Sequence, residues 1–369
     1  CLPPAAHARV SLPRFSSHMH LTVVVPELIW PEPGDRTTLD ALVCPALSAL
    51  LSRSRLQRRP PQSFEATLGD ACGLPAELAY AALRVLGEKN IVAAPAATWL
   101  CADPVHLRLH QEQLILADGS RLAITPDEAQ ACIDELNRQF VDSGCFHLGA
   151  TERWYLQLPA ERSLGDFTVL PLSVVAGRRV EQQLPAGADL RWLRSLLNEM
   201  QMVLHEHPVN QRREERGQPT INSLWLWGGG QLPNPQTSEI RRLWSDLPLA
   251  RGLARHLDIP CQPLPAHADA LLAKAIPDDQ ALLVLDALQA PVQYEDADAY
   301  RHALHDLEGR WFAPLRQALL TRRLRSLRLD APTAYAHLRW QSRPQEQWRF
   351  WRRSSSLASI AQSLAQSRT

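Results

Sequence analysis

Buried strands that alternate with helices restrict the fold of this chain more than any other feature of its sequence. Residues 20–25 (HLTVVV) form an apolar, β-branched run of the kind that predicts a strand buried on both faces. The second half of the chain repeats the pattern, with strands predicted at 222–227, 281–286 and 324–329 and helices predicted at 238–257 and 297–320. This order is typical of a mainly parallel sheet with helices on both faces, so the predicted class is α/β.

The middle of the chain follows a different pattern. Polar and apolar residues alternate over 105–116, and the Asp118-Gly119 pair after them predicts the turn of a hairpin. A helix is predicted to begin after Thr125, because this residue is a suitable N-cap and stands three residues before Glu128. These features indicate a compact α+β unit.

The two patterns divide the chain into segments. We expect an α/β core that is split between 19–97 and 216–338, with a smaller α+β unit inserted over 98–215. Residues 1–18 lack an apolar signal core and are expected to be an extension outside the fold. Residues 339–369 are basic and aromatic at first and then rich in Ser, Ala and Gln, which predicts a loosely held tail.

Charge balance and cysteine content exclude several classes of function. The 369 residues include 39 basic and 39 acidic side chains, so the overall positive field of a generic nucleic-acid-binding protein is missing. The Trp and Arg residues of the tail could contact nucleic acid, but packing on the core or on a protein partner is the favoured interpretation. No stretch approaches the roughly 20 apolar residues that cross a bilayer, so no membrane partner is expected. Seven scattered cysteines without a CxxC pair favour a reducing cytoplasm.

Residues 99–230 carry a resemblance to a known family. The segments WLCADPVHL, TPDEA, HEHPVNQRREERG and NSLWLWGGG resemble the middle of the archaeal-type cofactor-independent phosphoglycerate mutases, which belong to the alkaline phosphatase superfamily. Within this group the chain is most similar to the RpfE-type regulatory proteins. The resemblance implies an alkaline-phosphatase-like α/β/α sandwich that is interrupted by the insert. It also implies two divalent metal ions, Mn or Mg, and a nucleophilic hydroxyl, since the mutases transfer a phosphoryl group.

The residues that the mutases need are mostly absent where their motifs align with this sequence. The metal-binding Asp after the first strand is replaced by Glu27, and the Pro-Gly-Ser-Asp turn of the nucleophile aligns with residues 73–78, which contain no Ser or Thr. An Asp-Glu-x-x-His motif aligns with 289–293, which has Gln at both ends. Only Asp330 and His337 are left as vestiges of the metal ligands. We therefore expect no catalytic residue, no metal and no cofactor.

A small-anion pocket is the feature that we expect to survive. Arg153 stands where the family has a Tyr-Arg-His triplet, and guanidinium groups suit phosphate or carboxylate. The backbone N–H groups of glycines after a buried strand can also approach an anion closely. The candidate ligand-binding residues are Arg153, Asn210, Arg213, Asn222, Gly228, Gly229 and Gly230. The alternatives are ordinary ion pairing for the arginines and a tight turn for the glycines.

Taken together, these features predict a catalytically degenerate, cytoplasmic mutase-like protein with a regulatory or scaffold role. We expect a protein partner and a small phosphorylated or carboxylate ligand. The alternative is an active phosphoglycerate mutase, or a related phosphotransferase dependent on Mn or Mg, with a rearranged site.

Overall fold

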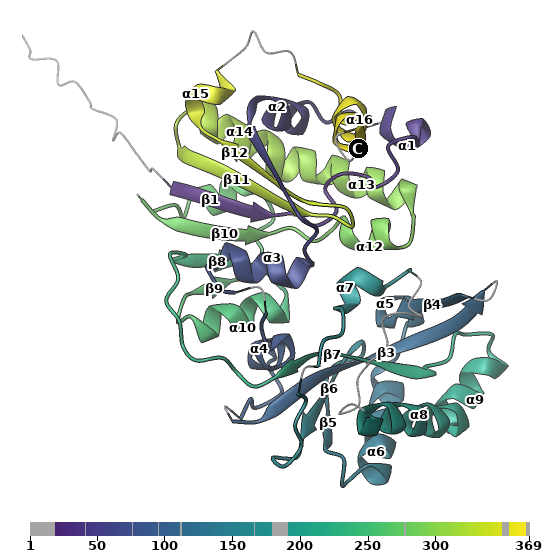
Figure 1. Cartoon of the computed structure of the whole chain (residues 1–369). Coiled ribbons are helices and arrows are strands. Elements are labelled where there is room, and N and C mark those ends of the chain that lie inside the picture. Colours follow the sequence, from purple (N-terminus) through teal and green to yellow (C-terminus); the bar gives the residue numbers. More distant parts are fainter. Residues whose placement is uncertain are drawn as a thin grey trace, which may run out of the picture.

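The computed structural model describes residues 19–366 except for gaps at 41, 76, 95, 111–112, 166, 179–190, 277 and 349–353. The expected extension over 1–18 lies outside the described residues. The described chain builds two sheets, each with its own helices, and Figure 1 shows the first sheet above the second. None of the described helices is long and apolar enough to cross a membrane.

Seven of the described strands form the first sheet, in the order β2-β12-β11-β1-β10-β8-β9. Strands β11, β1, β10, β8 and β9 are parallel, whereas β12 and β2 are added antiparallel at one edge. The bounds are Met19–Val24 (β1), Arg55–Arg59 (β2), Arg242–Trp244 (β8), Cys261–Gln262 (β9), Gln280–Val284 (β10), Leu324–Pro332 (β11) and His337–Ser342 (β12). The strands predicted at 20–25, 281–286 and 324–329 are thus confirmed as β1, β10 and β11, which lie side by side.

Helices cover both faces of this sheet because its central strands are apolar on both sides. Leu21 and Val23 of β1 join the core beneath α2, α13 and α14, while Val24 joins the core beneath α3, α4 and α10. The helices are Arg36–Asp40 (α1), Pro45–Arg53 (α2), Phe64–Ala71 (α3), Tyr80–Gly87 (α4), Pro248–His256 (α10), Ala268–Leu272 (α11), Gln289–Gln293 (α12), Ala297–Leu307 (α13), Ala313–Leu320 (α14), Pro344–Gln347 (α15) and Leu357–Gln366 (α16). The helix predicted over 297–320 is continuous through a π-turn at Glu308–Phe312.

Five described strands form the second sheet, in the order β4-β3-β6-β5 with β7 also paired to β3. They span Thr98–His110 (β3), Gln113–Asp118 (β4), Cys145–Ala150 (β5), Arg153–Leu158 (β6) and Ser223–Gly230 (β7). The helices of this unit, which we call the insert, are Gly119–Leu122 (α5), Pro126–Gln139 (α6), Leu172–Val175 (α7), Arg191–Glu206 (α8) and Pro208–Glu215 (α9). Helices α6, α8 and α9 cover one face of the sheet (Figure 1). The predicted class, an α/β core interrupted by a smaller α+β unit, is confirmed.

Four predicted details are wrong. The helix predicted over 238–257 begins only at Pro248 as α10, because Arg242–Trp244 forms the strand β8. The strand predicted in the core at 222–227 belongs to β7, which pairs antiparallel with β3, so the insert continues to Gly230. Residues 339–342, assigned to the tail, belong to β12 and pair with β11, because Leu338 and Trp340 are buried in the core. Asp118 does not make a hairpin turn: its side chain accepts from the N–H of Ser120 and caps α5.

Helices α4 and α10 approach each other at two glycines. A Cβ on Gly252 would lie 1.7 Å from the carbonyl oxygen of Leu83, and one on Gly87 would lie 1.8 Å from that of Pro248. Because both obstacles are backbone atoms, we expect Gly252→Ala to push the helices apart and to cost about 3 kcal/mol of stability. Urea unfolding would measure this loss of stability. Gly309→Ala is the matched control, since a Cβ there meets nothing within 4 Å; equal stability of the two variants would contradict the close packing.

Candidate functional site

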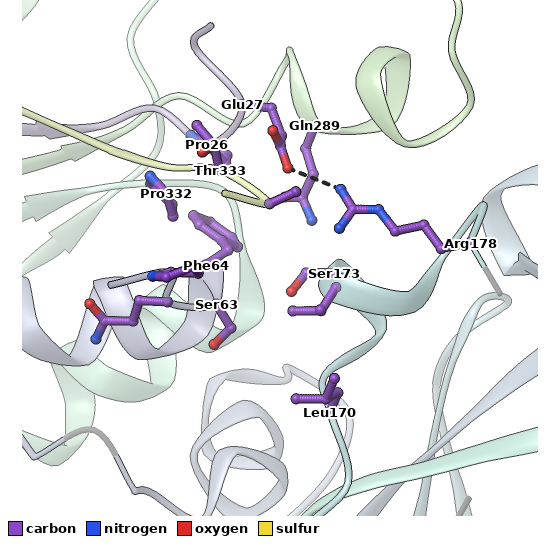
Figure 2. A pocket seen from close by; sticks show the side chains of 14 residues that line it. Pro26, Glu27, Ser63, Phe64, Leu170, Ser173, Arg178, Gln289, Pro332 and Thr333 are labelled. Carbon is purple, nitrogen blue, oxygen red and sulfur yellow. Dashed lines mark hydrogen bonds and ion pairs between the residues drawn. The ribbon is translucent and has the colours of Figure 1, made fainter. Parts of the chain in front are cut away.

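A cavity of about 200 Å³ lies at the carboxyl ends of β1 and β11, between the first sheet and the insert. This edge of an open α/β sheet is where ligands generally bind. The cavity is lined by residues that follow β1 and β11, by the start of α3, and by the segment around α7 of the insert (Figure 2). Its polar lining residues include Glu27, Ser63, Ser173, Arg178, Gln289 and Thr333.

Glu27 is the acidic group of this cavity. Its carboxylate Oε1 lies 3.4 Å from Nη2 of Arg178, and Oε2 has no hydrogen-bond partner. Burial raises the pKa of Glu27 to about 7, and the opposing effect of Arg178 is smaller. The residue therefore changes charge close to neutral pH.

Ser63 is a functional candidate that the sequence analysis missed. It is the N-cap of α3, where its hydroxyl oxygen accepts from the N–H of Ala66 at 3.1 Å, and it lines the cavity. The segment 73–78, aligned with the nucleophile motif from sequence, follows α3 and does not open a helix. The available signal was Pro61-Gln62-Ser63-Phe64, which also resembles Pro-Gly-Ser-Asp and does open a helix.

Glu65, in the first turn of α3, ties the insert to the core. Its Oε2 accepts from the hydroxyl of Ser173 at 2.6 Å, and the side chain is buried. Burial raises the pKa of Glu65. The backbone carbonyl of Ser173 also accepts from Nε2 of Gln293 at 2.7 Å. These contacts fix α7 against the edge of the first sheet.

Asp330 and His337 lie together, as their alignment with metal ligands suggested, but two arginines surround the carboxylate. Asp330 Oδ1 lies 3.5 Å from His337 Nε2 and 2.6 Å from Arg339 Nε, and Oδ2 lies 2.9 Å from Arg328 Nε. Both Asp330 and His337 are fully buried. Burial alone would raise the pKa of Asp330, but His337 and the two guanidinium groups hold it below its usual value. Arg339 also pairs with Asp70 at 2.5 Å.

The described residues do not fit the two-metal centre that the resemblance implies. Among them, no group of three or more His, Cys, Asp or Glu side chains is placed to hold a metal ion. The guanidinium groups of Arg328 and Arg339 already neutralise Asp330, so a divalent cation at this carboxylate would meet like charges. Glu27, which the resemblance aligns with a metal-binding Asp, is paired with Arg178.

Three of the predicted ligand-binding residues hold the insert together. Arg213 is buried and binds Glu128 Oε2 at 2.7 Å and the carbonyls of Pro219 and Leu122. Asn210 donates to the carbonyls of Leu204 and Ile221, and Asn222 exchanges two hydrogen bonds with the backbone of Leu107. Their polar groups are thus used within the fold.

Arg153 lies elsewhere in the insert, where it pairs with Glu88 and Glu152, both at 2.9 Å. Gly228 and Gly229 line a second cavity of about 480 Å³, which shares Ser63 and Leu170 with the first. Gly230 lies at the end of β7, packed against Ala79. Gly228 and Gly229 therefore lie close to the first cavity. Arg153, Asn210, Arg213 and Asn222 line neither cavity.

Comparison with known proteins agrees with the sequence pattern. The chain is 31% identical over 208 residues to the 2,3-bisphosphoglycerate-independent phosphoglycerate mutase of Methanosarcina mazei, which is 54% of this chain and 51% of that protein. The enzyme of the same name from Methanosarcina acetivorans is 30% identical over 213 residues, 56% of this chain and 53% of that protein. The homologues of the present chain are thus phosphoglycerate mutases. The chain spans about half the length of the curated relatives it matches, and no protein-family model matches it.

A solved structure shows the same fold over most of the chain. The PH0037 protein from Pyrococcus horikoshii superposes with a TM-score of 0.55 and 15% sequence identity, over 88% of this chain and 87% of that one. The structural similarity to the PH0037 protein therefore covers more of the chain than the sequence similarity to the mutases does.

Proposed function

We propose that this chain is a catalytically degenerate homologue of the phosphoglycerate mutases, a cytoplasmic protein of the RpfE type with a regulatory or scaffold role. The observation that carries the proposal is the pairing of Asp330 with Arg328 and Arg339. Two guanidinium groups supply, within the protein, the positive charge that metal ions would otherwise bring to this carboxylate. Such a role implies a protein partner, and neither a membrane nor a nucleic acid is proposed.

The ligand that we propose is a small phosphorylated or carboxylate compound in the cavity between the first sheet and the insert. Arg178 provides a positive charge there, and α3 directs its N-terminus toward the same space through Ser63. Small anions suit both groups. We favour this cavity over Arg153, Asn210, Arg213 and Asn222, because those side chains already have partners within the protein.

Mutase activity and melting temperature, measured with and without metal ions, test the proposal. We expect the purified chain to show no conversion of 3-phosphoglycerate to 2-phosphoglycerate with added Mn²⁺ or Mg²⁺, and no rise in melting temperature with either ion. The Methanosarcina mazei mutase, assayed in parallel, controls for the conditions. Metal-dependent turnover that disappears in Ser63→Ala would show that the site is active and would overturn the proposal.

A further inference from the structure

Glu27 and Arg178 are the only charged side chains among the described residues that line the first cavity. Glu27 comes from the turn after β1, and Arg178 follows α7 of the insert, so their ion pair bridges the two units (Figure 2). The other lining residues are apolar or carry uncharged polar groups. The affinity of this cavity for a charged ligand therefore depends on how these two side chains bind each other.

The contact is a poor one for a buried carboxylate. The distance of 3.4 Å from Oε1 to the guanidinium exceeds the roughly 2.8 Å of a strong charge-assisted hydrogen bond. Oε2 has no hydrogen-bond partner, and the residue is only 7% exposed, so water compensates little. The backbone of Glu27 is also left-handed, with φ at 56°, and its N–H donates to the carbonyl of Pro332 at 2.9 Å. Besides Arg178, only the backbone of Ala334 among the described residues favours the ionised form of this carboxylate, and burial outweighs both.

The guanidinium group of Arg178 has N–H donors that Glu27 does not use. Its side chain is 34% exposed, and the one described contact of its guanidinium is the single interaction with Glu27 Oε1. A phosphate or carboxylate group can accept two parallel N–H bonds from one guanidinium. A small anion that enters the cavity would therefore bind Arg178 in a better geometry than Glu27 does.

We propose that Glu27 is an internal counter-anion, and that a small ligand with a phosphate or carboxylate group binds in this cavity by displacing Glu27 from Arg178. The inference rests on the proposed function, because it assumes that the cavity takes an anionic ligand. The exchange acts as an autoinhibitory contact: Glu27 keeps Arg178 neutralised until a ligand competes successfully for it.

The exchange has a charge consequence. Two anions cannot share one guanidinium in a buried cavity without repulsion, so the displaced carboxyl takes up a proton as the ligand binds. Arg178 and the phenol of Tyr300 on α13 are the titratable groups that act on Glu27, and burial raises the pKa of Tyr300 far above neutral. Tyr300 therefore stays uncharged while Glu27 titrates.

This consequence predicts how affinity varies with pH. With a pKa of about 7, Glu27 is half protonated at pH 7 and about nine-tenths ionised at pH 8. Because ligand binding requires the protonated form, affinity is hardly reduced below this pKa and falls by up to about tenfold for each pH unit above it. Binding thus weakens as pH rises through the pKa of Glu27.

Calorimetric titration of the full chain tests the exchange with three probes: inorganic phosphate, 3-phosphoglycerate and glycerate. We expect Glu27→Gln to bind at least one probe about tenfold more tightly than the wild type at pH 8, with little difference at pH 6. Arg178→Gln is expected to lose binding. Glu32→Gln is the matched control, because it makes the same change on an exposed side chain of the same loop. Titration of the wild type in two buffers of different ionisation enthalpy should show close to one proton taken up at pH 8, and this measurement needs no variant.

The outcomes separate the exchange from the proposed function. If wild type and Glu27→Gln bind a probe equally at pH 8, with no proton uptake, the exchange is overturned and the ligand site remains. If neither protein binds any probe at millimolar concentration, the anionic ligand itself is overturned, and the exchange with it. Binding that survives in Arg178→Gln would place the ligand elsewhere and would also overturn the exchange.

Discussion

Replacement of Asp330 by alanine is expected to destabilise the protein by about 3–5 kcal/mol, the loss typical of breaking a buried ion pair from one side. The carboxylate is fully buried and lies within 2.9 Å of Arg328 Nε and 2.6 Å of Arg339 Nε. Its removal leaves two guanidinium groups close together without their shared counter-charge. Urea unfolding followed by circular dichroism would measure the loss.

Asp306→Ala is the control for Asp330→Ala, because Asp306 on α13 pairs with Arg310 at the surface and such pairs contribute at most about 1 kcal/mol. Folding lowers the pKa of Asp330, so its stabilisation is present at neutral pH and is lost as pH falls through the folded pKa, below about 3.9. Equal stability of the two variants at pH 7 would show that the arginines do not depend on Asp330.

Elements that are specified locally could be predicted from the sequence. Thr125 and Glu128 predict the start of α6, and both hydrogen bonds of the capping box are present, at 3.3 Å and 3.0 Å. The apolar run of β1 is buried on both faces, as its composition indicates. Each of these signals lies within a few residues and does not depend on distant contacts.

The partners of a strand could not be predicted in the same way. Residues of β7 are as apolar as those of β1, so the pattern indicates burial without saying which sheet is joined. Pairing with β3 is decided by contacts more than a hundred residues away, such as Trp225 opposite Asp103. Strand β12, which lies between β2 and β11, could not be predicted for a related reason: Leu338 and Trp340 alternate with Arg339 and Gln341, and these polar residues concealed the pattern.

The candidate site shows the same division. A guanidinium suits an anion, but the sequence does not show that Arg213 is occupied by Glu128 and two backbone carbonyls. The position of Glu27 shortly after β1 could be predicted. Its pairing with Arg178 could not, because the two residues are 151 positions apart. Ser63 could have been found by requiring that the nucleophile open a helix.

Arg84 on α4 and Asp103 on β3 form a buried ion pair between α4 and the second sheet. We expect its loss to reduce the free energy of unfolding as much as the loss of Asp330 does. Arg84 donates to both carboxylate oxygens of Asp103, at 2.9 Å and 2.5 Å, and Trp227 Nε1 donates to the same carboxylate at 2.8 Å. The guanidinium also lies over the ring of Tyr155, 4.7 Å from its centroid. Asp103→Ala leaves both donors buried without an acceptor, so we expect a loss of about 3–5 kcal/mol in urea unfolding.

A double variant separates the charge from the packing at this contact. Asp103→Asn keeps an acceptor for Trp227, and Arg84→Met removes the cation while filling much of its volume, so the pair together should lose less than half of what Asp103→Ala loses. Asp142→Ala, an exposed change in the same unit, should stay within about 0.5 kcal/mol of the wild type. A double variant as unstable as Asp103→Ala would mean that the loss comes from packing of the Arg84 side chain. Arg84 lies on a helix of the core and Asp103 on a strand of the insert. A double variant that is more stable than Asp103→Ala would therefore show that an uncompensated buried charge destabilises the contact between the two units.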